Sequence, residues 1–299
     1  MNCAENLEFV ILAAGKSTRN YPQSKGLPHK SLMPFSDHKI IDEIMLRLAD
    51  AGARHVTLVV SDQSVVRHFE DAFRPEPALE EKFAKAGNAE MLELVRGVRL
   101  PDDMDIKYVI QGTPRGTGQA MGLAYAAVRD SGRNLAMVFP DDMIVAENGA
   151  EHIYSRAVRQ YSENGGRGNL AITREVDDPS RWGVVQDGYL LEKPKQATSR
   201  DSVVSLVIFD KSVGQEFYKD ALRLERGEEI DGLVGGELVY MNALNRSIDA
   251  DFATNALQKC KTTENDVYLD CGTVSGYEKS LVYSLTKLSR FKKDNRWTD

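Results

Sequence analysis

The chain has 299 residues, of which 42% are hydrophobic and 28% charged, a composition that is ordinary for a globular protein. That length suits one large α/β domain or two small ones. The formal net charge of −7 argues against a broad nucleic-acid-binding surface, so a protein of this kind that handles phosphates has to gather its essential lysines and arginines at one site.

The amino-terminal segment has a short apolar run after an acidic start, without the basic region and cleavage site of a signal peptide. No apolar stretch approaches membrane-spanning length. Cys3, Cys260 and Cys271 are too few and too scattered for a disulfide framework or a zinc site, so we expect reduced thiols. The sequence therefore predicts a cytoplasmic protein without a membrane or nucleic-acid partner.

Strands and helices are predicted to alternate along the first part of the chain. Residues 9–13 form a short apolar run that ends in a glycine loop at 14–19, as expected of a buried strand. Residues 40–51 have apolar side chains at helical spacing, 55–60 read as a second strand, and 63–73 as a second helix. This alternation is typical of parallel βαβ units.

An acidic helical insertion at 75–97 interrupts this pattern, and the segment after 178 is rich in strands. Further strands are predicted at 105–110, 134–140, 169–175, 183–186, 189–192, 202–209 and 267–270. Further helices are predicted at 116–129, 149–164, 212–225, 237–245 and 276–288, with a frayed or surface-bound tail at 290–299. Together these elements predict an α/β fold with a Rossmann-like, mixed and mostly parallel open sheet flanked by helices. Ligands in such sheets bind beyond the carboxyl ends of the strands.

The sequence LAAGKSTR follows the first strand. Small residues there let backbone N–H groups approach phosphate oxygens, so Ala13, Ala14 and Gly15 are candidate nucleotide-binding residues. Arg19, at the end of the loop, can pair with the same phosphates. A tight turn with a surface arginine explains the pattern equally well, and the spacing is not that of a Walker A loop.

Two prolines flank Lys30 in PHKSLMP, and the extended backbone that they favour can aim this lysine into a site. A single lysine is weak evidence of a functional site. Lys30 is a candidate here only because Arg19 is a candidate as well. His29 is expected to be an exposed loop residue.

The segment QGTPRGTGQA again follows a strand and opens a helix. Gln111 offers both a donor and an acceptor, the mixture that the imide edge of uracil or thymine needs, and Gly116 permits close approach of a ligand. This loop thus favours a pyrimidine over a purine. A simple helix-terminal turn remains the alternative.

Carboxylates follow two predicted strands. Asp141 and Asp142 come after the apolar segment VFP, and Asp270 comes after a later strand. Two carboxylates from separate strand ends suit Mg²⁺, which takes oxygen ligands and keeps phosphate oxygens in its shell. The alternative is an aspartate pair that caps the next helix.

A hairpin-like unit runs from WGVV to LEKP. Within it, Glu192 is placed to bind sugar hydroxyls, and Lys193 to neutralise a sugar phosphate. Glu-Lys-Pro is also a common surface turn.

Eight motifs occur in order over about residues 8–285: LAAGKSTR, PHKSLMP, VIQGTPRGTGQA, VFPDD, WGVV, LEKP, GGEL and LDCGT. In this order they resemble the sugar-1-phosphate nucleotidyltransferases, and among them the bacterial UTP–glucose-1-phosphate uridylyltransferases. The resemblance implies a single domain with the nucleotide-diphospho-sugar transferase fold. Residues 1–145 would form mainly the nucleotide-binding half and 146–290 mainly the sugar-phosphate-binding half.

The resemblance also implies a reaction, in which a sugar 1-phosphate attacks the α-phosphorus of UTP or dTTP in line and pyrophosphate leaves. Glucose 1-phosphate is the expected sugar, CTP stays open, and a homo-oligomer is expected. The implied catalytic residues are Arg19, Lys30 and Lys193. The implied ligand-binding residues are Ala13, Ala14, Gly15, Gln111 and Gly116 for the nucleotide, Gly183 and Glu192 for the sugar, and Asp141 and Asp270 for Mg²⁺.

Some residues depart from the family pattern. Ser17 replaces a glycine, which is acceptable at a negative φ, while Ser205 and Asn242 change the sugar side. Two other classes stay open. A non-catalytic nucleotide-sugar-binding subunit would be expected to lose Lys30, Lys193 or Asp141, none of which is lost. A nucleotide-sugar-dependent glycosyltransferase would need the aspartate pair but not the AAG loop.

Overall fold

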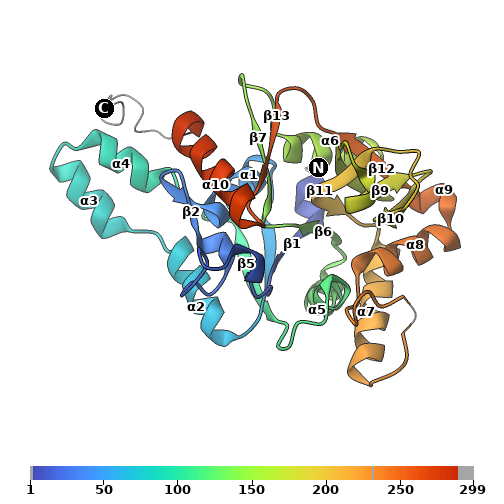
Figure 1. Cartoon of the computed structure of the whole chain (residues 1–299). Helices are drawn as coiled ribbons and strands as arrows, with labels where there is room; N and C mark the ends of the chain where they lie inside the picture. Colours follow the sequence, from blue (N-terminus) through green and yellow to red (C-terminus); the bar gives the residue numbers. More distant parts are fainter. Residues whose placement is uncertain (1–2, 231, 289–299) are drawn as a thin grey trace.

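A nine-stranded sheet forms the centre of the molecule (Figure 1), and the computed structural model describes residues 3–230 and 232–288. Its strands are β1 (Leu7–Ala13), β4 (His55–Val60), β5 (Asp105–Ile110), β6 (Asn134–Val138), β8 (Asn169–Glu175), β9 (Gly183–Gln186), β10 (Tyr189–Glu192), β11 (Asp201–Ile208) and β12 (Leu257–Lys261). Two ribbons lie outside it, one of β2 (Pro34–Phe35) and β3 (His38–Lys39), the other of β7 (Asp142–Ala146) and β13 (Asp266–Asp270). The tail predicted at 290–299 lies outside the described residues.

The sheet is mixed. Along its main path the order is β10-β9-β11-β6-β1-β4-β5, and β8 pairs with both β11 and β12. Strands β6, β1, β4 and β5 run parallel to one another, whereas β11 is antiparallel to β6, β8 and β9. The predicted Rossmann-like mixed sheet is thereby confirmed.

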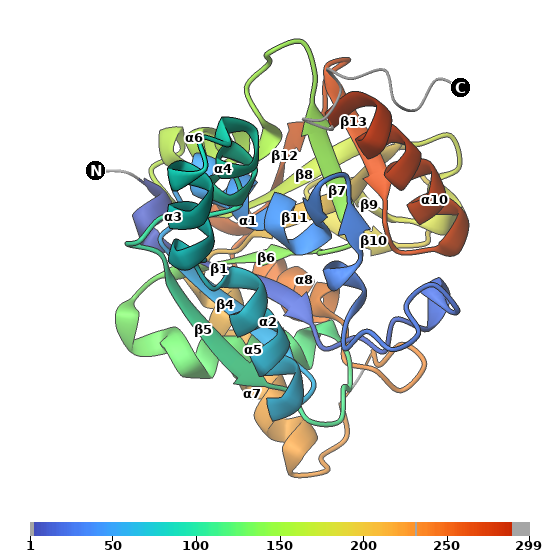
Figure 2. The ribbon, with the colours of Figure 1, turned by 90° about the vertical axis from the view of Figure 1, so that its left-hand side faces the viewer.

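Helices cover both faces of the sheet (Figure 2). They are α1 (Ile40–Asp50), α2 (Gln63–Phe73), α3 (Pro77–Lys85), α4 (Ala89–Arg96), α5 (Thr117–Val128), α6 (Ile153–Glu163), α7 (Lys211–Glu225), α8 (Tyr240–Ala250), α9 (Phe252–Asn255) and α10 (Val274–Tyr283). Within the part of the chain that the structure describes, none of them is both long enough and apolar enough to cross a membrane.

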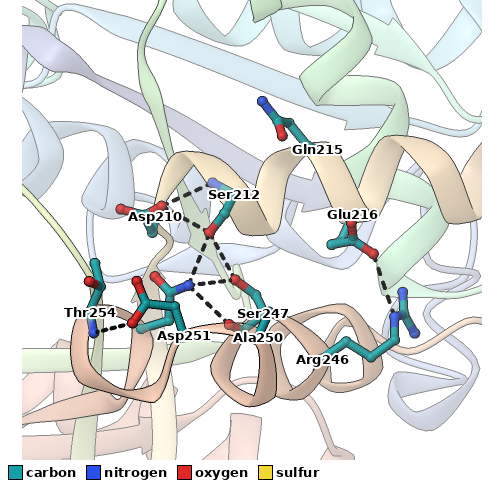
Figure 3. A pocket seen from close by; sticks show the side chains of 10 residues that line it. Asp210, Ser212, Gln215, Glu216, Arg246, Ser247, Ala250, Asp251 and Thr254 are labelled. Carbon is teal, nitrogen blue, oxygen red and sulfur yellow. Dashed lines mark hydrogen bonds and ion pairs between the residues drawn. The ribbon is translucent and has the colours of Figure 1, made fainter.

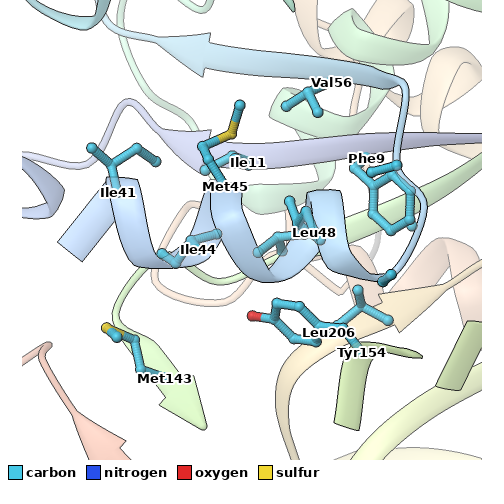
Figure 4. Close-up of a cluster of buried hydrophobic side chains, with 14 of the residues drawn as sticks. Phe9, Ile11, Ile41, Ile44, Met45, Leu48, Val56, Met143, Tyr154 and Leu206 are labelled. Atoms are coloured by element: carbon cyan, nitrogen blue, oxygen red, sulfur yellow. The ribbon is translucent and has the colours of Figure 1, made fainter. Parts of the chain in front are cut away.

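Strand β1 is apolar on both faces because helices cover both. Side chains alternate along a strand, so Phe9 and Ile11 join the core beneath α1 and α6 whereas Val10 joins the core with α5 and α7. Helix α1 presents a matching apolar stripe to the first of these cores (Figure 4). The residues of this stripe are Ile41, Ile44, Met45 and Leu48. Each such fully buried side chain contributes roughly 1.5–3 kcal/mol.

The insertion after α2 forms two helices, as predicted. Helices α3 and α4 bury none of their residues and lie at the edge of the molecule, apart from the main sheet (Figure 1). An ion pair of 3.0 Å between Glu80 and Arg96 joins them. They therefore add little to the core.

Helix α8 begins at Tyr240, three residues after the predicted start at 237. The backbone of Val234 and Glu237 pairs in a tight bridge, and the Leu238 carbonyl accepts a hydrogen bond of 2.8 Å from the Gly118 N–H. The backbone before Tyr240 is thus held against the start of α5 and cannot be helical.

Sheet topology brings three loops to one edge. Strands β1 and β6 are adjacent and parallel, with Ile11 beside Val138, so the loops that follow them leave the sheet together. In the antiparallel ribbon Asp270 lies opposite Asp142, which places the end of β13 beside the loop that follows β6.

Candidate active site

The first loop turns sharply at Ser17, whose φ is +53°. The condition under which serine is readily acceptable at this position, a negative φ, is therefore not met. A left-handed conformation costs a residue with a side chain about 1–2 kcal/mol. Local hydrogen bonds offset this cost, because the Ser17 hydroxyl accepts from the Lys30 N–H at 3.0 Å and the Ser17 carbonyl accepts from the Asn20 N–H at 3.1 Å.

The three small residues before this turn differ in exposure. Ala13 and Ala14 are buried, whereas Gly15 is exposed and has no atom within 4 Å of the position that a Cβ would take. The backbone of the loop is therefore open to approach at Gly15. A role of these residues in nucleotide binding stays a prediction.

Two cations from separate segments contact one carboxylate. Nη2 of Arg19 lies 3.3 Å from Oδ2 of Asp141, and Nζ of Lys30 contacts the same oxygen. Lys30 is largely buried, with 12% of its side chain exposed, whereas 69% of Arg19 is exposed. Burial raises the pKa of Asp141, but Lys30 and then Arg19 outweigh it and hold this pKa below its usual value, so the carboxylate is ionised.

His29 is buried, with 1% of its surface exposed, and the expectation of an exposed residue is wrong. Its ring lies beside Phe69, with 6.3 Å between the ring centroids, and its Nδ1 accepts from the Ser31 N–H at 3.2 Å. Burial and then the neighbouring Lys30 lower the pKa of His29 to about 3, so the imidazole is neutral. His29 thus anchors Lys30 to the core.

Asp270 faces Asp141 across Gly272. Its two carboxylate oxygens accept hydrogen bonds from the Gly272 N–H and the Thr273 hydroxyl, both at 2.7 Å. A Cβ built on Gly272 would lie 2.5 Å from Oδ2 of Asp141 and 3.2 Å from Oδ1 of Asp270. The two carboxylates therefore border the same small space. The Cys271 N–H ties the segments together by donating to the Asp141 carbonyl at 2.7 Å.

Asp142 begins strand β7, so the alternative that the aspartate pair caps a helix is wrong. Tyr268 donates a hydrogen bond of 2.7 Å to Oδ1 of Asp142. Burial, followed by the charge of Asp141, raises the pKa of Asp142 to about 7. Sequence reasoning missed Tyr268, although its position two residues before Asp270 puts it on the same face of β13.

The carboxylates of Asp141 and Asp270 fit a divalent cation of the magnesium type. Mg²⁺ in proteins commonly takes one or two carboxylates and completes its shell with phosphate oxygens and water. Within residues 3–230 and 232–288, no three His, Cys, Asp or Glu side chains are arranged to hold a metal by themselves. Asp141 and Asp270 therefore suit a cation that arrives with a phosphate ligand, rather than an all-protein cage.

The amide of Gln111 is held by its own loop. Its Nε2 donates to the Gly116 carbonyl at 3.0 Å and to Oε1 of Gln119 at 2.9 Å, and that oxygen also accepts from the Arg115 N–H at 2.8 Å. Both amide hydrogens are thus committed, and the expectation of a free donor is wrong. Gln111 offers a ligand an acceptor only. Gln119, which fixes this orientation, was missed by sequence reasoning.

Gly116 approaches the backbone of another segment. Its φ is +107°, and a Cβ there would overlap the carbonyl oxygen of Leu238 and lie 2.7 Å from the Leu238 nitrogen. Glycine is required here by the contact with Leu238, whether or not a nucleotide also approaches.

The hairpin of β9 and β10 pairs Glu192 with Gly183. Nζ of Lys193 lies 3.2 Å from Oε1 of Glu192, and 61% of the Lys193 side chain is exposed. No contact joins Lys193 to Asp141 among the described residues. Burial and then the charges of Glu192 and Asp142 raise the pKa of Tyr240, so one tyrosine is affected by both the hairpin and the acidic cluster.

The two departures on the expected sugar side have structural partners. Ser205 lies in an irregular part of β11 at a φ of +63°, fully buried, with its hydroxyl 2.8 Å from that of Tyr154. Asn242 donates to the Gly232 carbonyl at 2.6 Å. The Ser205 side chain therefore does not face a ligand.

A pocket of about 400 Å³ lies between the ends of α7, α8 and α9 (Figure 3). It contains none of the candidate residues, and several of its polar groups are engaged in local structure. Asp210 caps α7 by accepting from the Ser212 N–H at 3.0 Å, and Asp251 caps α9 by accepting from the Thr254 N–H at 3.2 Å. We therefore place the candidate active site at the charged cluster and not in this pocket.

The chain is similar to known nucleotidyltransferases. A family model described as nucleotidyl transferase matches residues 8–280. A glucose-1-phosphate thymidylyltransferase of Neisseria meningitidis is 24% identical over 228 residues, which cover 74% of this chain and 67% of that protein. The catalytic subunit beta of a mannose-1-phosphate guanylyltransferase from Drosophila pseudoobscura is 27% identical over 68% of this chain, and the chain spans 48% of that protein's length.

Solved structures share the fold. A UDP-glucose pyrophosphorylase from Acinetobacter baumannii superposes with a TM-score of 0.72 at 21% identity, covering 94% of both chains. An apo UDP-glucose pyrophosphorylase gives a TM-score of 0.76 at 19% identity, covering 94% of this chain and 99% of that one.

Proposed function

Because the chain belongs to the nucleotidyl transferase family, we propose that it joins a nucleoside triphosphate to a sugar 1-phosphate and releases pyrophosphate. Glucose 1-phosphate is the sugar phosphate that we favour, on the sequence motifs. A cytoplasmic location, a homo-oligomeric state and a division into a nucleotide half and a sugar half belong to the same proposal, and they rest on the sequence.

The convergence of charge at Asp141 carries the proposal. Arg19 and Lys30 come from different parts of the first long loop, yet both contact the Asp141 carboxylate, and Asp270 borders it across Gly272. Two cations and two carboxylates within a few ångströms supply the charges that a triphosphate and a divalent cation need.

In the proposed reaction, a phosphate oxygen of the sugar 1-phosphate attacks the α-phosphorus of the triphosphate. A new P–O bond forms as the bond to the β-phosphate oxygen breaks, and pyrophosphate leaves with that electron pair. Arg19 and Lys30 would transfer their contacts from Asp141 to the phosphate oxygens and stabilise the leaving group. Lys193 would orient the sugar phosphate, and Glu192 and Gly183 would contact the sugar.

Asp141 and Asp270 would hold Mg²⁺, which supplies charge neutralisation at the reacting phosphates. Asp142 is less suited to this task, because one of its carboxylate oxygens already accepts a hydrogen bond from Tyr268. Its hydrogen bond from Tyr268 instead fixes the end of β7.

The acceptor of Gln111 favours bases that carry a ring N–H at their pairing edge. Uracil and thymine have such a group, as does guanine, whereas the ring nitrogens at the corresponding edge of cytosine and adenine are acceptors. UTP or dTTP remains our proposal for the nucleotide, with GTP as the next candidate and CTP disfavoured.

Pyrophosphate release tests the proposal directly. Purified protein is incubated with Mg²⁺ and each pairing of UTP, dTTP, GTP, CTP or ATP with glucose 1-phosphate or mannose 1-phosphate, and the nucleotide sugar is identified by mass spectrometry. We expect turnover with at least one pair, and loss of it when Mg²⁺ is chelated. Absence of turnover with every pair, in protein shown to be folded, would refute the proposal.

A further inference from the structure

Arg174, near the end of β8, is held between two aromatic rings. Its guanidinium carbon lies 4.9 Å from the ring centroid of Trp182 and 4.1 Å from that of Tyr268. Contacts of this kind use the faces of the guanidinium plane, whereas its N–H groups point outward in that plane. The two rings thus fix the group without consuming its donors.

The donors of Arg174 have no partner among the described residues. Its Nε is buried without a hydrogen bond, and neither an ion pair nor a hydrogen bond reaches its terminal nitrogens. Arg200, close by, provides a contrast, because it pairs with Glu175 at 3.3 Å and with Asp177 at 2.8 Å. Because the rings fix this guanidinium and no protein group in the described part of the chain pairs with its terminal nitrogens, these nitrogens are available to an external acceptor.

The two aromatic neighbours of Arg174 each make a hydrogen bond in one part of the candidate site. The Tyr268 ring beneath Arg174 carries the hydroxyl that binds Asp142 at 2.7 Å, next to Asp141. The Trp182 carbonyl accepts a hydrogen bond of 2.9 Å from the Lys193 N–H. Tyr268 therefore connects Arg174 to the acidic cluster, and Trp182 connects it to the sugar hairpin.

We propose that Arg174 binds the phosphate group of the sugar 1-phosphate, an inference that rests on the proposed function. A phosphomonoester dianion accepts two parallel hydrogen bonds from a guanidinium fork, and the clamp of two rings presents that fork in one orientation. The positive charge also offsets the carboxylates of Asp141 and Asp270, which would otherwise repel the substrate. Arg174, in β8, and Lys193, just after β10, then approach the same phosphate from separate segments.

Three variants test this role by kinetics. Arg174→Met keeps the long stem between the rings but removes the charge and the donors. Arg174→Lys keeps the charge without the fork, and Arg200→Met is the matched control on an arginine that has carboxylate partners. For Arg174→Met we expect KM for glucose 1-phosphate to rise roughly 10- to 100-fold, with KM for the nucleotide within about twofold of wild type. For Arg174→Lys, KM for glucose 1-phosphate should lie between the values for wild type and Arg174→Met. For Arg200→Met it should match the wild-type value.

Binding without turnover provides a second readout. The sequence has two tryptophans, Trp182 and Trp297, so a Trp297→Phe background isolates the fluorescence of Trp182. We expect glucose 1-phosphate and inorganic phosphate to change this fluorescence, and glucose to leave it unaltered. Introducing Arg174→Met into the same background should weaken the phosphate response by at least tenfold, and Arg174→Lys should weaken it less.

The outcomes separate the two proposals. Turnover by wild type, together with an unchanged KM for glucose 1-phosphate in folded Arg174→Met and Arg174→Lys, would overturn the role of Arg174 and leave the proposed function standing. Phosphate binding that needs Arg174, in a wild-type protein that turns over no substrate pair, would instead refute the proposed function and keep the anion site.

Discussion

Substituting Gly272 by alanine places a methyl group between the two carboxylates of the site. Its Cβ would lie 2.5 Å from Oδ2 of Asp141 and 3.2 Å from Oδ1 of Asp270. Ordinary van der Waals contact begins near 3.4 Å, so the Asp141 oxygen has to retreat by about 0.9 Å. Gly272 is not at a positive φ, and alanine keeps the N–H that binds Asp270, so the backbone itself tolerates the change.

The expected damage falls on function rather than on the fold. The displaced atom is the end of a side chain, which can rotate, so we expect a loss of stability of no more than about 1–2 kcal/mol. Mg²⁺ demands ligands near 2.0–2.1 Å in octahedral geometry, and a misplacement of about 1 Å in a positioned group can cost about 100-fold in rate. We expect the Mg²⁺ concentration for half-maximal activity to rise at least tenfold and kcat at saturating Mg²⁺ to fall.

Pyrophosphate release measured over a series of Mg²⁺ concentrations checks this prediction. Gly214→Ala is the matched control, because its Cβ would lie 2.6 Å from the Tyr125 ring, an overlap of similar size remote from the carboxylates. The control should lower the melting temperature and leave the Mg²⁺ dependence unchanged. If Gly272→Ala, shown to be folded, kept the wild-type Mg²⁺ dependence and rate, the assignment of Asp141 and Asp270 to the metal would be refuted.

Three further predictions concern stability and turnover. The pKa of His29 is about 3 in the folded protein and near 6.5 in the unfolded chain, so only the unfolded chain takes up this proton as the pH falls from neutral to 5. The free energy of unfolding should therefore fall by about 2 kcal/mol between neutral pH and pH 5. His29→Asn keeps the capping acceptor without titrating, so urea unfolding at pH 5 and 7.5 should differ less in this variant than in wild type. Gly116→Ala should destabilise by about 2 kcal/mol or more, because backbone at Leu238 blocks the Cβ and φ is positive; an unchanged urea midpoint would contradict this reasoning. Lys193→Ala should lower kcat roughly 100- to 1000-fold with an unchanged melting temperature, since its side chain is 61% exposed; near-normal turnover would mean that its role is misassigned.

Strands with strong apolar patterns were predictable from the sequence. Those at His55–Val60 and Asp105–Ile110 were predicted with the bounds that the structure has. Strand β12, in contrast, was missed, because its sequence LQKCK buries only Leu257 and Cys260 and has no period-two alternation. Strand β7 was missed because only three residues separate its start from the end of β6. The sequence predicted a single strand at 134–140 and no second strand directly after it.

Charged residues at strand ends were also predictable, but their orientations were not. Topology alone brings the ends of β1 and β6 together, so Arg19 and Asp141 could be expected at one edge. The stacking of Arg174 depends on Trp182, which lies just before β9, and on Tyr268 in β13, and no local pattern links these three residues. The commitment of the Gln111 donors likewise depends on the fold of its loop.

A protein of net charge −7 can bind polyanions because charge acts locally here. At physiological salt the Debye length is about 8 Å, so Arg19 and Lys30 beside Asp141 matter more to a phosphate than distant acids. Asp141 holds both flexible side chains in place, which reduces the conformational entropy that binding has to remove.

Because Asp141 holds the two cations and is also a proposed metal ligand, substitutions of Asp141 and Asp270 should have different kinetic effects. Asp141→Asn should raise both the Mg²⁺ requirement and KM for the nucleotide, because it loosens Arg19 and Lys30 as well as the metal. Asp270 makes no ion pair among the described residues and contacts only uncharged donors at Gly272 and Thr273, so Asp270→Asn should raise the Mg²⁺ requirement with KM for the nucleotide nearly unchanged at saturating Mg²⁺. Steady-state kinetics at high and low Mg²⁺ measure both quantities. Equal effects of the two variants on KM for the nucleotide would show that Asp141 does not organise the cations.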